Sequence, residues 1–412
     1  MEAKYKRVKL ACCMSGLSMS VVANLPPLLF LTFNSQYNIS YSLLGFLVLV
    51  NYFTQMIVDL ILSFFSHRFD IPKTVKFIPV LTTIGLLIFS IWPYLFPGNA
   101  FWGILIGTIV FSASGGLNEV LISPVIAAIP AKDPDREMSK LHSIYAWGVV
   151  GVVIISTVFI ITFGAENWHW LAILFTAIPL IASALFLGAE IPEMETPEKV
   201  TGVIALLKNR VLWLMVFAIF LGGAAECTMS QWCSGYVEQA LGIPKVWGDV
   251  FGVALFGLSL GLGRTLYGKF GKNIGKVLVL GVIGSTLCYL ISAISPFPVL
   301  ALFACVFTGF CSSMLWPGSL IASTELVPHG GVFIYAIMAA GGDFGAALGP
   351  QLIGLVTDFA IKNPTMLAIA EKLGLTGAQL GLKAGMVVGM LFPLVAIPVF
   401  IHILNMLKKS TR

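Results

Sequence analysis

The chain has 412 residues, of which 58% are hydrophobic and only 10% are charged, and its mean hydropathy is +0.95. In soluble domains roughly a quarter of all residues are charged, so this composition excludes an ordinary soluble protein and indicates an integral membrane protein. The net charge of +5 does not point to nucleic acid as a partner, because Lys and Arg in such proteins report topology first. The seven cysteines show no metal-binding spacing, so we expect neither a disulfide framework nor a metal site.

Apolar runs of spanning length follow one another along the chain, with one polar interruption. In the first half we expect spans at about 10–33, 41–65, 75–96, 101–130, 141–163 and 168–189. After the interruption we expect spans at about 211–240, 247–268, 277–295, 298–326, 332–360 and 384–407. The pattern predicts an all-α integral membrane protein with twelve transmembrane helices. Its expected parts are an N-terminal six-helix bundle over 1–190, a cytoplasmic linker over 191–210 and a C-terminal six-helix bundle over 211–412.

The basic residues of the loops test this topology independently. Of the 24 Lys and Arg residues, nineteen fall on the side of the membrane that holds the N-terminus. Four fall on the other side, and Arg264 lies within a span. Since cytoplasmic loops carry the excess of Lys and Arg, both termini and the central linker are predicted to be cytoplasmic. A wrong number of spans would place later loops on the opposite side of the membrane and remove this asymmetry.

The two halves of the chain echo one another, which is typical of a duplicated transporter. One offset of 193 positions relates three pairs of residues in corresponding spans: Gly116 and Gly309, Pro124 and Pro317, Gly148 and Gly341. The agreement in order predicts two pseudo-symmetric bundles.

Three acidic residues lie inside expected spans: Glu119 in the fourth, Glu226 in the seventh and Asp343 in the eleventh. A charged side chain at this depth costs roughly 2.5 to 3.5 kcal/mol on insertion scales, so each is a functional candidate. A carboxyl that is protonated on one side of the membrane and released on the other would couple transport to protons. The alternative is a structural carboxyl that is hydrogen-bonded to a neighbouring helix.

Neutral polar and indole side chains are the candidates for solute contact. Asn51 and Gln55 share one helical face with Asp59, and such a polar stripe is unsuited to lipid. Glu226 lies six residues before Trp232, an acid and an aromatic that suit either a sugar or an organic cation. Trp232 could instead face lipid at the interface. The predicted substrate-binding residues are Asn51, Gln55, Asn118, Gln231, Trp232 and Trp316.

Several stretches resemble the major facilitator superfamily, and most closely its fucose permease branch of proton-linked sugar symporters. They are GGLNEVLISPVIAAIP followed by LHSIYAWGVVG, then GGAAECTMSQWCSGYVEQALG in the seventh span and GLGRTLYGKFGK in the eighth. The resemblance implies the six-plus-six architecture over the whole chain. It also implies that Glu119 occupies the position of a protonatable acid.

The loop after the second span departs from the superfamily pattern G-x-x-x-D-R-x-G-R-K. The chain keeps Arg68 and Lys73 but has His67 in place of the acid and Asp70 in place of the glycine. We assign Arg68 and Lys73 to the cytoplasmic gate on this resemblance. Asp59 and Arg264 lie at similar depths in corresponding spans and are expected to belong to a gating charge network.

The sequence therefore predicts a secondary active transporter that moves a small polar solute by alternating access with proton coupling. The resemblance implies that this solute is a sugar or a sugar-like compound. Sodium is the alternative ion, since a carboxylate suits either. A monomer in a bacterial inner membrane is expected, with no cofactor. An enzyme is not predicted, because phosphate-binding glycine loops and a soluble ATPase domain are missing from the sequence. Two alternatives stay open: an exporter of drugs or organic cations, and a receptor or scaffold that transports nothing.

Overall fold

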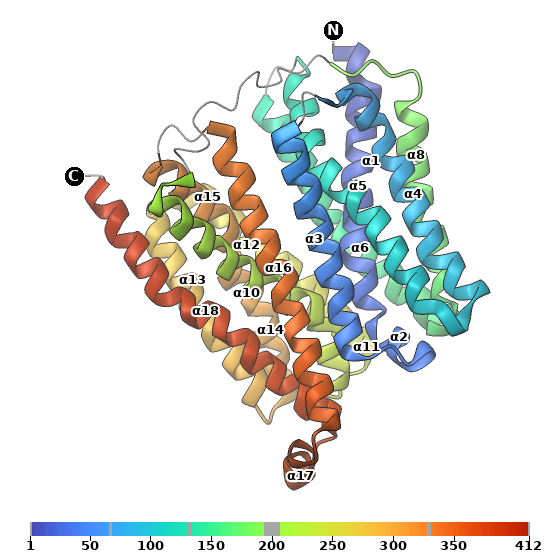
Figure 1. Cartoon of the computed structure of the whole chain (residues 1–412), viewed down its shortest axis with the longest axis vertical. Coiled ribbons are helices and arrows are strands. Elements are labelled where there is room, and N and C mark those ends of the chain that lie inside the picture. The colour runs from blue at the N-terminus through green and yellow to red at the C-terminus, as the bar shows by residue number, and fades with distance from the viewer. Residues whose placement is uncertain (1, 66–67, 131–133, 193–206, 328–330, 411–412) are drawn as a thin grey trace. The chain divides into compact units, whose positions relative to one another are not determined.

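The computed structural model describes residues 2–65, 68–130, 134–192, 207–327 and 331–410 (Figure 1). Among these described residues, eleven helices are long and apolar enough to cross a membrane. A shorter apolar stretch, Trp147–Phe163, lies within α6 (Pro134–Phe163). Together they confirm the all-α, twelve-span prediction. Many large apolar side chains on the helix surfaces are exposed, for example Leu280 at 69% and Phe303 at 61%, as expected of a surface that contacts lipid.

Contacts divide the chain into two compact units. Unit 1 holds the described residues of 1–37 and 53–201, and unit 2 holds those of 38–52 and 202–412. Helix α3 (Tyr41–Phe65) therefore belongs to unit 2 up to Tyr52 and to unit 1 from Phe53. Most of the expected linker over 191–210, namely 193–206, lies outside the described residues.

Each unit is built from long helices joined by short turns. Besides its part of α3 and the helix α6, unit 1 contains α1 (Glu2–Leu28), α2 (Phe30–Tyr37), α4 (Ile71–Leu95), η2 (Pro97–Asn99), α5 (Ala100–Ala128), η3 (Ala165–Asn167), α7 (Trp168–Phe175) and α8 (Ala177–Phe186). Unit 2 contains α10 (Arg210–Gln239), α11 (Lys245–Gly248), the π-helix η4 (Asp249–Ala254), α12 (Leu255–Phe270), α13 (Ile274–Ile294), α14 (Pro298–Ser312), α15 (Leu315–Leu326), α16 (Gly331–Lys362), α17 (Pro364–Lys372) and α18 (Gly377–Ser410).

Each unit has its own apolar core, formed by buried side chains from several of its helices. The unit 1 core includes the buried side chains of Leu62, Val75, Leu121, Val125 and Phe186. The unit 2 core includes those of Met215, Leu278, Leu315, Met338 and Phe400. The remaining faces of these helices are free to carry the polar groups that define the site.

Proline explains where the spanning helices break. Proline has no N–H, so the carbonyl four residues earlier loses its helical partner. Pro26 and Pro27 lie at the end of α1, and the chain continues as α2 from Phe30. Pro179 and Pro317 stand at the third positions of α8 and α15, which follow directly on the breaks after α7 and α14. Three spans expected from the sequence as single helices, at 10–33, 168–189 and 298–326, are thus each divided between two helices.

The glycines of the predicted repeat make matching close approaches in the two units. A Cβ added at Gly116 of α5 would lie 3.0 Å from the Val58 Cβ of α3. A Cβ added at Gly309 of α14 would lie 2.5 Å from the Phe256 carbonyl oxygen of α12. In each unit, then, the fourth span packs on the second through a glycine at the repeated position.

The second repeated pair behaves in the same way. A Cβ added at Gly148 of α6 would collide with the Ser20 hydroxyl of α1. A Cβ added at Gly341 of α16 would lie 2.8 Å from the Val216 Cγ1 of α10. The fifth span of each unit therefore packs on the first, because small residues let helix backbones approach closely.

A carboxylate from another helix caps the start of α3. The Asp358 side chain of α16 accepts hydrogen bonds from the backbone N–H groups of Tyr41 at 3.1 Å and Ser42 at 3.0 Å. These are two of the N–H groups that a helix start leaves without intrahelical partners. Gly354 makes room, since a Cβ there would collide with the Tyr41 carbonyl oxygen. Asp358 thus ties α3 to α16 within unit 2.

Replacing Asp358 by alanine is expected to lower the melting temperature of the purified protein. Loss of an N-cap acceptor costs about 0.5–2 kcal/mol, and here one buried and one partly buried N–H group lose their partner. Asn363→Ala is the matched control, because Asn363 caps the short helix α17 through the N–H groups of Thr365 and Met366. An equal and small shift for both variants would contradict the importance of the Asp358 cap.

Candidate solute and coupling site

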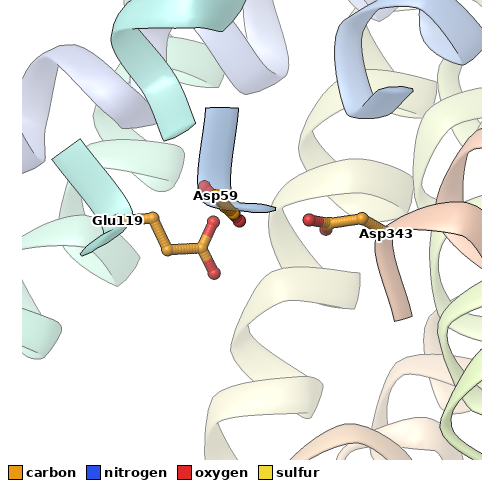
Figure 2. Close-up of side chains that lie close together, drawn as sticks. All are labelled: Asp59, Glu119 and Asp343. Atoms are coloured by element: carbon orange, nitrogen blue, oxygen red, sulfur yellow. The ribbon is translucent and has the colours of Figure 1, made fainter. Parts of the chain in front are cut away.

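Two acidic side chains lie together inside unit 1. Asp59 comes from α3 and Glu119 from α5, and their carboxylate oxygens lie within 4.8 Å of each other. Figure 2 shows the two carboxyl groups turned toward one another. Asp59 is only 4% exposed, whereas Glu119 is exposed. The pair therefore joins a buried carboxyl to an exposed one.

Two consecutive glycines bring α5 close enough to α3 for this pairing. A Cβ added at Gly116 would lie 3.0 Å from the Asp59 Oδ1, and one added at Gly115 would lie 3.3 Å from the Gln55 Oε1. Asn118 directly precedes Glu119 in α5. Its side chain is buried, and its Oδ1 has no hydrogen-bond partner among the described residues. Gln55, Asp59, Asn118 and Glu119 thus fall on neighbouring turns of two helices that nearly touch.

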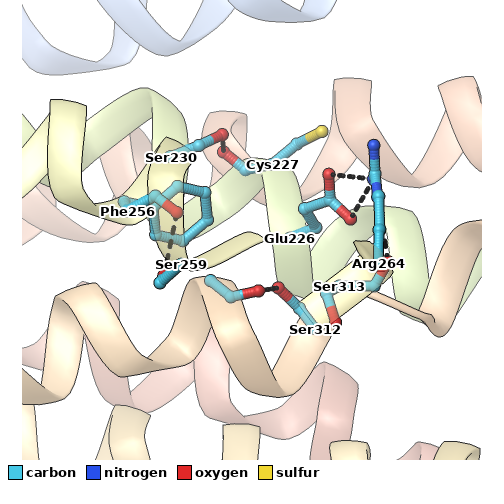
Figure 3. A network of polar contacts seen from close by, with 9 residues as sticks. Glu226, Cys227, Ser230, Phe256, Ser259, Arg264, Ser312 and Ser313 are labelled. Carbon is cyan, nitrogen blue, oxygen red and sulfur yellow. Dashed lines mark hydrogen bonds and ion pairs between the residues drawn. The ribbon is translucent and has the colours of Figure 1, made fainter. Parts of the chain in front are cut away.

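An ion pair lies inside unit 2, between the seventh and eighth spans. The Arg264 Nη2 of α12 lies 3.2 Å from the Glu226 Oε1 and 3.4 Å from the Oε2 of α10. The same guanidinium donates from Nε to the Ser313 carbonyl oxygen at 3.0 Å (Figure 3). Arg264 therefore connects α10, α12 and the break between α14 and α15. In this structure Arg264, expected to act in a gate, has Glu226 as its acidic partner.

The proline of the broken helix explains the third contact of Arg264. In an unbroken helix the Ser313 carbonyl would accept from the N–H of residue 317, but that residue is a proline and has none. A buried carbonyl without a partner is unfavourable, and the guanidinium supplies the missing donor. Pro317 therefore creates the acceptor that fixes the position of Arg264.

The two basic residues assigned to the cytoplasmic gate lie at the surface of unit 1. Arg68 stacks over Phe65, with 5.4 Å between its Cζ and the ring centroid. The Lys73 ammonium lies 2.7 Å from the Asp70 Oδ2, and Asp70 caps α4 through the Lys73 N–H. These hydrogen bonds hold the pKa of Asp70 below its usual range. The gating role of Arg68 and Lys73 stays a prediction.

Asp343 is buried in α16, among glycines that draw this helix against α10. A Cβ added at Gly342 would lie 2.5 Å from the Trp316 Cη2, and one at Gly223 would lie 2.5 Å from the Gly342 carbonyl oxygen. Trp316 is half-buried and covers both glycines. The structure thus brings Asp343 and Trp316 to adjacent helices of one unit.

The other predicted solute contacts of unit 2 are buried. Asn51 and Gln231 are buried, and the Gln231 Nε2 lies 3.5 Å from the Tyr52 hydroxyl. Trp232 is fully buried, donates its N–H to the Pro350 carbonyl oxygen at 2.8 Å and stacks on Tyr41. In this conformation Trp232 serves packing, with its only donor already used.

Sequence reasoning missed a buried polar cluster in the connection between the seventh and eighth spans. The Lys245 ammonium lies 3.1 Å from the Asp249 Oδ2 and donates to the Ser234 hydroxyl at 3.1 Å. The Ser234 hydroxyl in turn donates to the Asp249 Oδ1. The available signal was the spacing of four residues between Lys245 and Asp249, which suits a helical ion pair. The cap formed by Asp358 left no comparable signal.

Two compact helical units, twelve apolar spans and ionisable side chains within those spans are the architecture of a secondary transporter. The family model described as Major Facilitator Superfamily matches residues 10–350. The chain belongs to this superfamily of membrane transporters. No match was found among curated proteins.

Solved structures share this fold at low sequence identity. A bacterial homolog of the human lysosomal transporter Spinster, in an inward-facing and occupied conformation, has a TM-score of 0.77 and 13% identity, with 100% of this chain and 99% of that chain covered. The xylose transporter XylE from E. coli, in an inward open conformation, has a TM-score of 0.69 and 16% identity, with 95% and 96% covered. The nucleoside transporter NupG has a TM-score of 0.71 and 15% identity, with 98% and 99% covered. These structures do not single out the fucose permease branch.

Proposed function

We propose that the protein is a proton-coupled secondary transporter in which Asp59 and Glu119 hold the transported proton. The observation that carries this proposal is the distance of at most 4.8 Å between their carboxylate oxygens. Two carboxylates this close avoid ionising together, and a membrane interior adds to the cost, so the pair favours retaining one proton. The exposed Glu119 carboxyl is the group proposed to take up and release that proton.

The proposed solute is small and polar, a sugar or a sugar-like compound. Amide and indole side chains are suited to hydroxyl groups and to an apolar ring face. We propose Asn51, Gln55, Asn118, Gln231 and Trp316 as contacts, with Trp232 in support, and Glu226 and Asp343 as further acids in coupling. Two of the similar structures are a xylose transporter and a nucleoside transporter, which agrees with a solute of this kind.

Transport by alternating access is proposed, the mechanism by which secondary transporters expose a central site to each side of the membrane in turn. Asp59, Arg68, Lys73 and Arg264 are the proposed gating residues. The excess of basic residues on one side supports cytoplasmic termini, and a bacterial inner membrane and a monomeric state complete the proposal. The alternative is that sodium, not the proton, is the coupling ion. The transport assay distinguishes the two ions.

The test is a flux measurement on the purified full chain in lipid vesicles. Under an imposed pH gradient, with and without sodium, a panel of neutral sugars, sugar acids and nucleosides is added outside. The expected result is alkalinisation of the outer solution that depends on one class of solute and not on sodium. Binding without proton movement would instead support a receptor, and competition by lipophilic cations alone would support an exporter.

A further inference from the structure

The guanidinium of Arg264 is only partly used by its partners. Both Glu226 oxygens share the single nitrogen Nη2, at 3.2 and 3.4 Å. Charge-assisted N–H to carboxylate bonds are usually about 2.7–2.9 Å long, and Arg binds carboxylates best through two parallel bonds. Nη1 donates to no described residue, and the Arg264 side chain is 44% exposed against 13% for Glu226. An accessible edge of a fixed guanidinium is thus left open.

We infer that Arg264 recognises an anionic group of the solute, and that Glu226 is the resident carboxylate which this group replaces. The inference rests on the proposed transport function and names the class of its solute: a small polyhydroxylated monocarboxylate, a sugar acid. A solute carboxylate placed on the Nη1 and Nη2 edge would form the two parallel bonds that Glu226 does not form. The hydrogen bond from Nε to the Ser313 carbonyl keeps the guanidinium oriented while the solute carboxylate replaces Glu226.

Charge balance favours one negative charge on the solute. The charged groups near the exchange are Glu226 of α10, Arg264 of α12 and Asp343 of α16. Asp343 directly follows Gly342, whose carbonyl oxygen would lie 2.5 Å from a Cβ added at Gly223, three residues before Glu226. The break between α14 and α15 contributes the uncharged Ser313 carbonyl. When the solute carboxylate pairs with Arg264, the released Glu226 carboxylate must take up one proton to keep the net charge unchanged. A second charge on the solute would stand uncompensated beside Asp343.

The experiment measures binding by the full-length protein in detergent, as a rise in melting temperature with ligand concentration. The probes are two matched pairs, D-glucuronate with D-glucose and D-galacturonate with D-galactose. At least one acid should stabilise the protein, and its neutral counterpart should need a concentration about tenfold higher, or more, for the same effect.

Three variants test the residues. Arg264→Lys keeps the charge but loses the planar guanidinium that can form two parallel bonds, and should weaken acid binding about tenfold. Glu226→Gln removes the competitor and should tighten it about tenfold, a difference of about 1.4 kcal/mol. Arg210→Lys, at the exposed start of α10, is the control and should bind as the wild type does.

Three outcomes would overturn the inference: neither acid binds, each neutral sugar binds as tightly as its acid, or Glu226→Gln weakens binding of the acid. Vesicle flux separates this failure from that of the proposed function. If neutral sugars drive proton uptake equally in wild type and Arg264→Lys, the transporter proposal stands and this inference falls. If the acids bind through Arg264 and no probe moves protons, the recognition site stands and the coupling proposal falls.

Discussion

Glu119→Gln is expected to abolish accumulation of the solute against its gradient, while exchange of internal for external solute continues. Glutamine resembles the protonated acid in shape but cannot release a proton. With one proton per solute, each pH unit of gradient is worth about 1.4 kcal/mol and supports about tenfold accumulation. The variant should therefore fall from roughly tenfold per pH unit to no accumulation. Radiolabelled uptake into vesicles, with and without a pH gradient, measures this ratio.

Glu166→Gln is the matched control for this experiment. Glu166 is an exposed acid in η3, between α6 and α7, and has no part in the proposed site. Its variant should accumulate solute as the wild type does. If Glu119→Gln retains full proton-driven accumulation, Glu119 is not the coupling acid and the Asp59–Glu119 pair has a structural role.

Gly345→Ala should produce the largest loss of stability of the variants considered. The Gly345 of α16 packs directly on α10: an added Cβ would collide with the Phe220 carbonyl oxygen and lie 2.9 Å from the Ala224 nitrogen. Both neighbours are backbone atoms, so a side-chain movement cannot relieve the contact, and the helices must separate. Overpacking of this kind costs typically about 1–3 kcal/mol. The melting temperature of the purified protein should fall clearly, or the variant should fail to accumulate as folded protein.

Gly261→Ala makes the same chemical change where space is open. Gly261 lies inside α12, and an added Cβ would meet nothing within 4 Å. Alanine is favoured over glycine in a helix by about 0.5–1 kcal/mol, so this variant should be unchanged or slightly more stable. Equal melting temperatures for the two variants would show that α16 and α10 can separate at Gly345 without cost.

Much of the fold was predictable, because the length and hydropathy of an apolar segment are enough to predict a spanning helix. The repeat was also visible, since Gly116 and Gly309 must remain small wherever the fourth span of a unit packs on the second. The prolines indicated irregular helices, as at Pro26 and Pro27. Predictions of this kind depend on one segment at a time, or on a simple offset between two segments.

The partners inside the site were not predictable in the same way. Whether Arg264 meets Glu226 depends on the rotation of α12 about its axis, on its depth beside α10 and on the freed carbonyl of Ser313. These follow from packing across three helices, which no local pattern contains. The Asp358 cap was missed for the same reason, because its acceptors lie more than three hundred positions away from the N–H groups they serve. Asp59 was predicted to act with Arg264 because the two residues lie at similar depths in corresponding spans. In the structure, the acid beside Asp59 within its own unit is Glu119.

The dependence of Arg264 on Pro317 has an evolutionary consequence. A residue with an N–H at position 317 would restore the helical partner of the Ser313 carbonyl and release the Nε of Arg264. An arginine without that anchor would lose the orientation of its fork, and an intact helix would leave no acceptor for it. Among homologues of this chain, the proline and the arginine should therefore covary: they should be retained or lost as a pair, although fifty-three positions separate them in sequence.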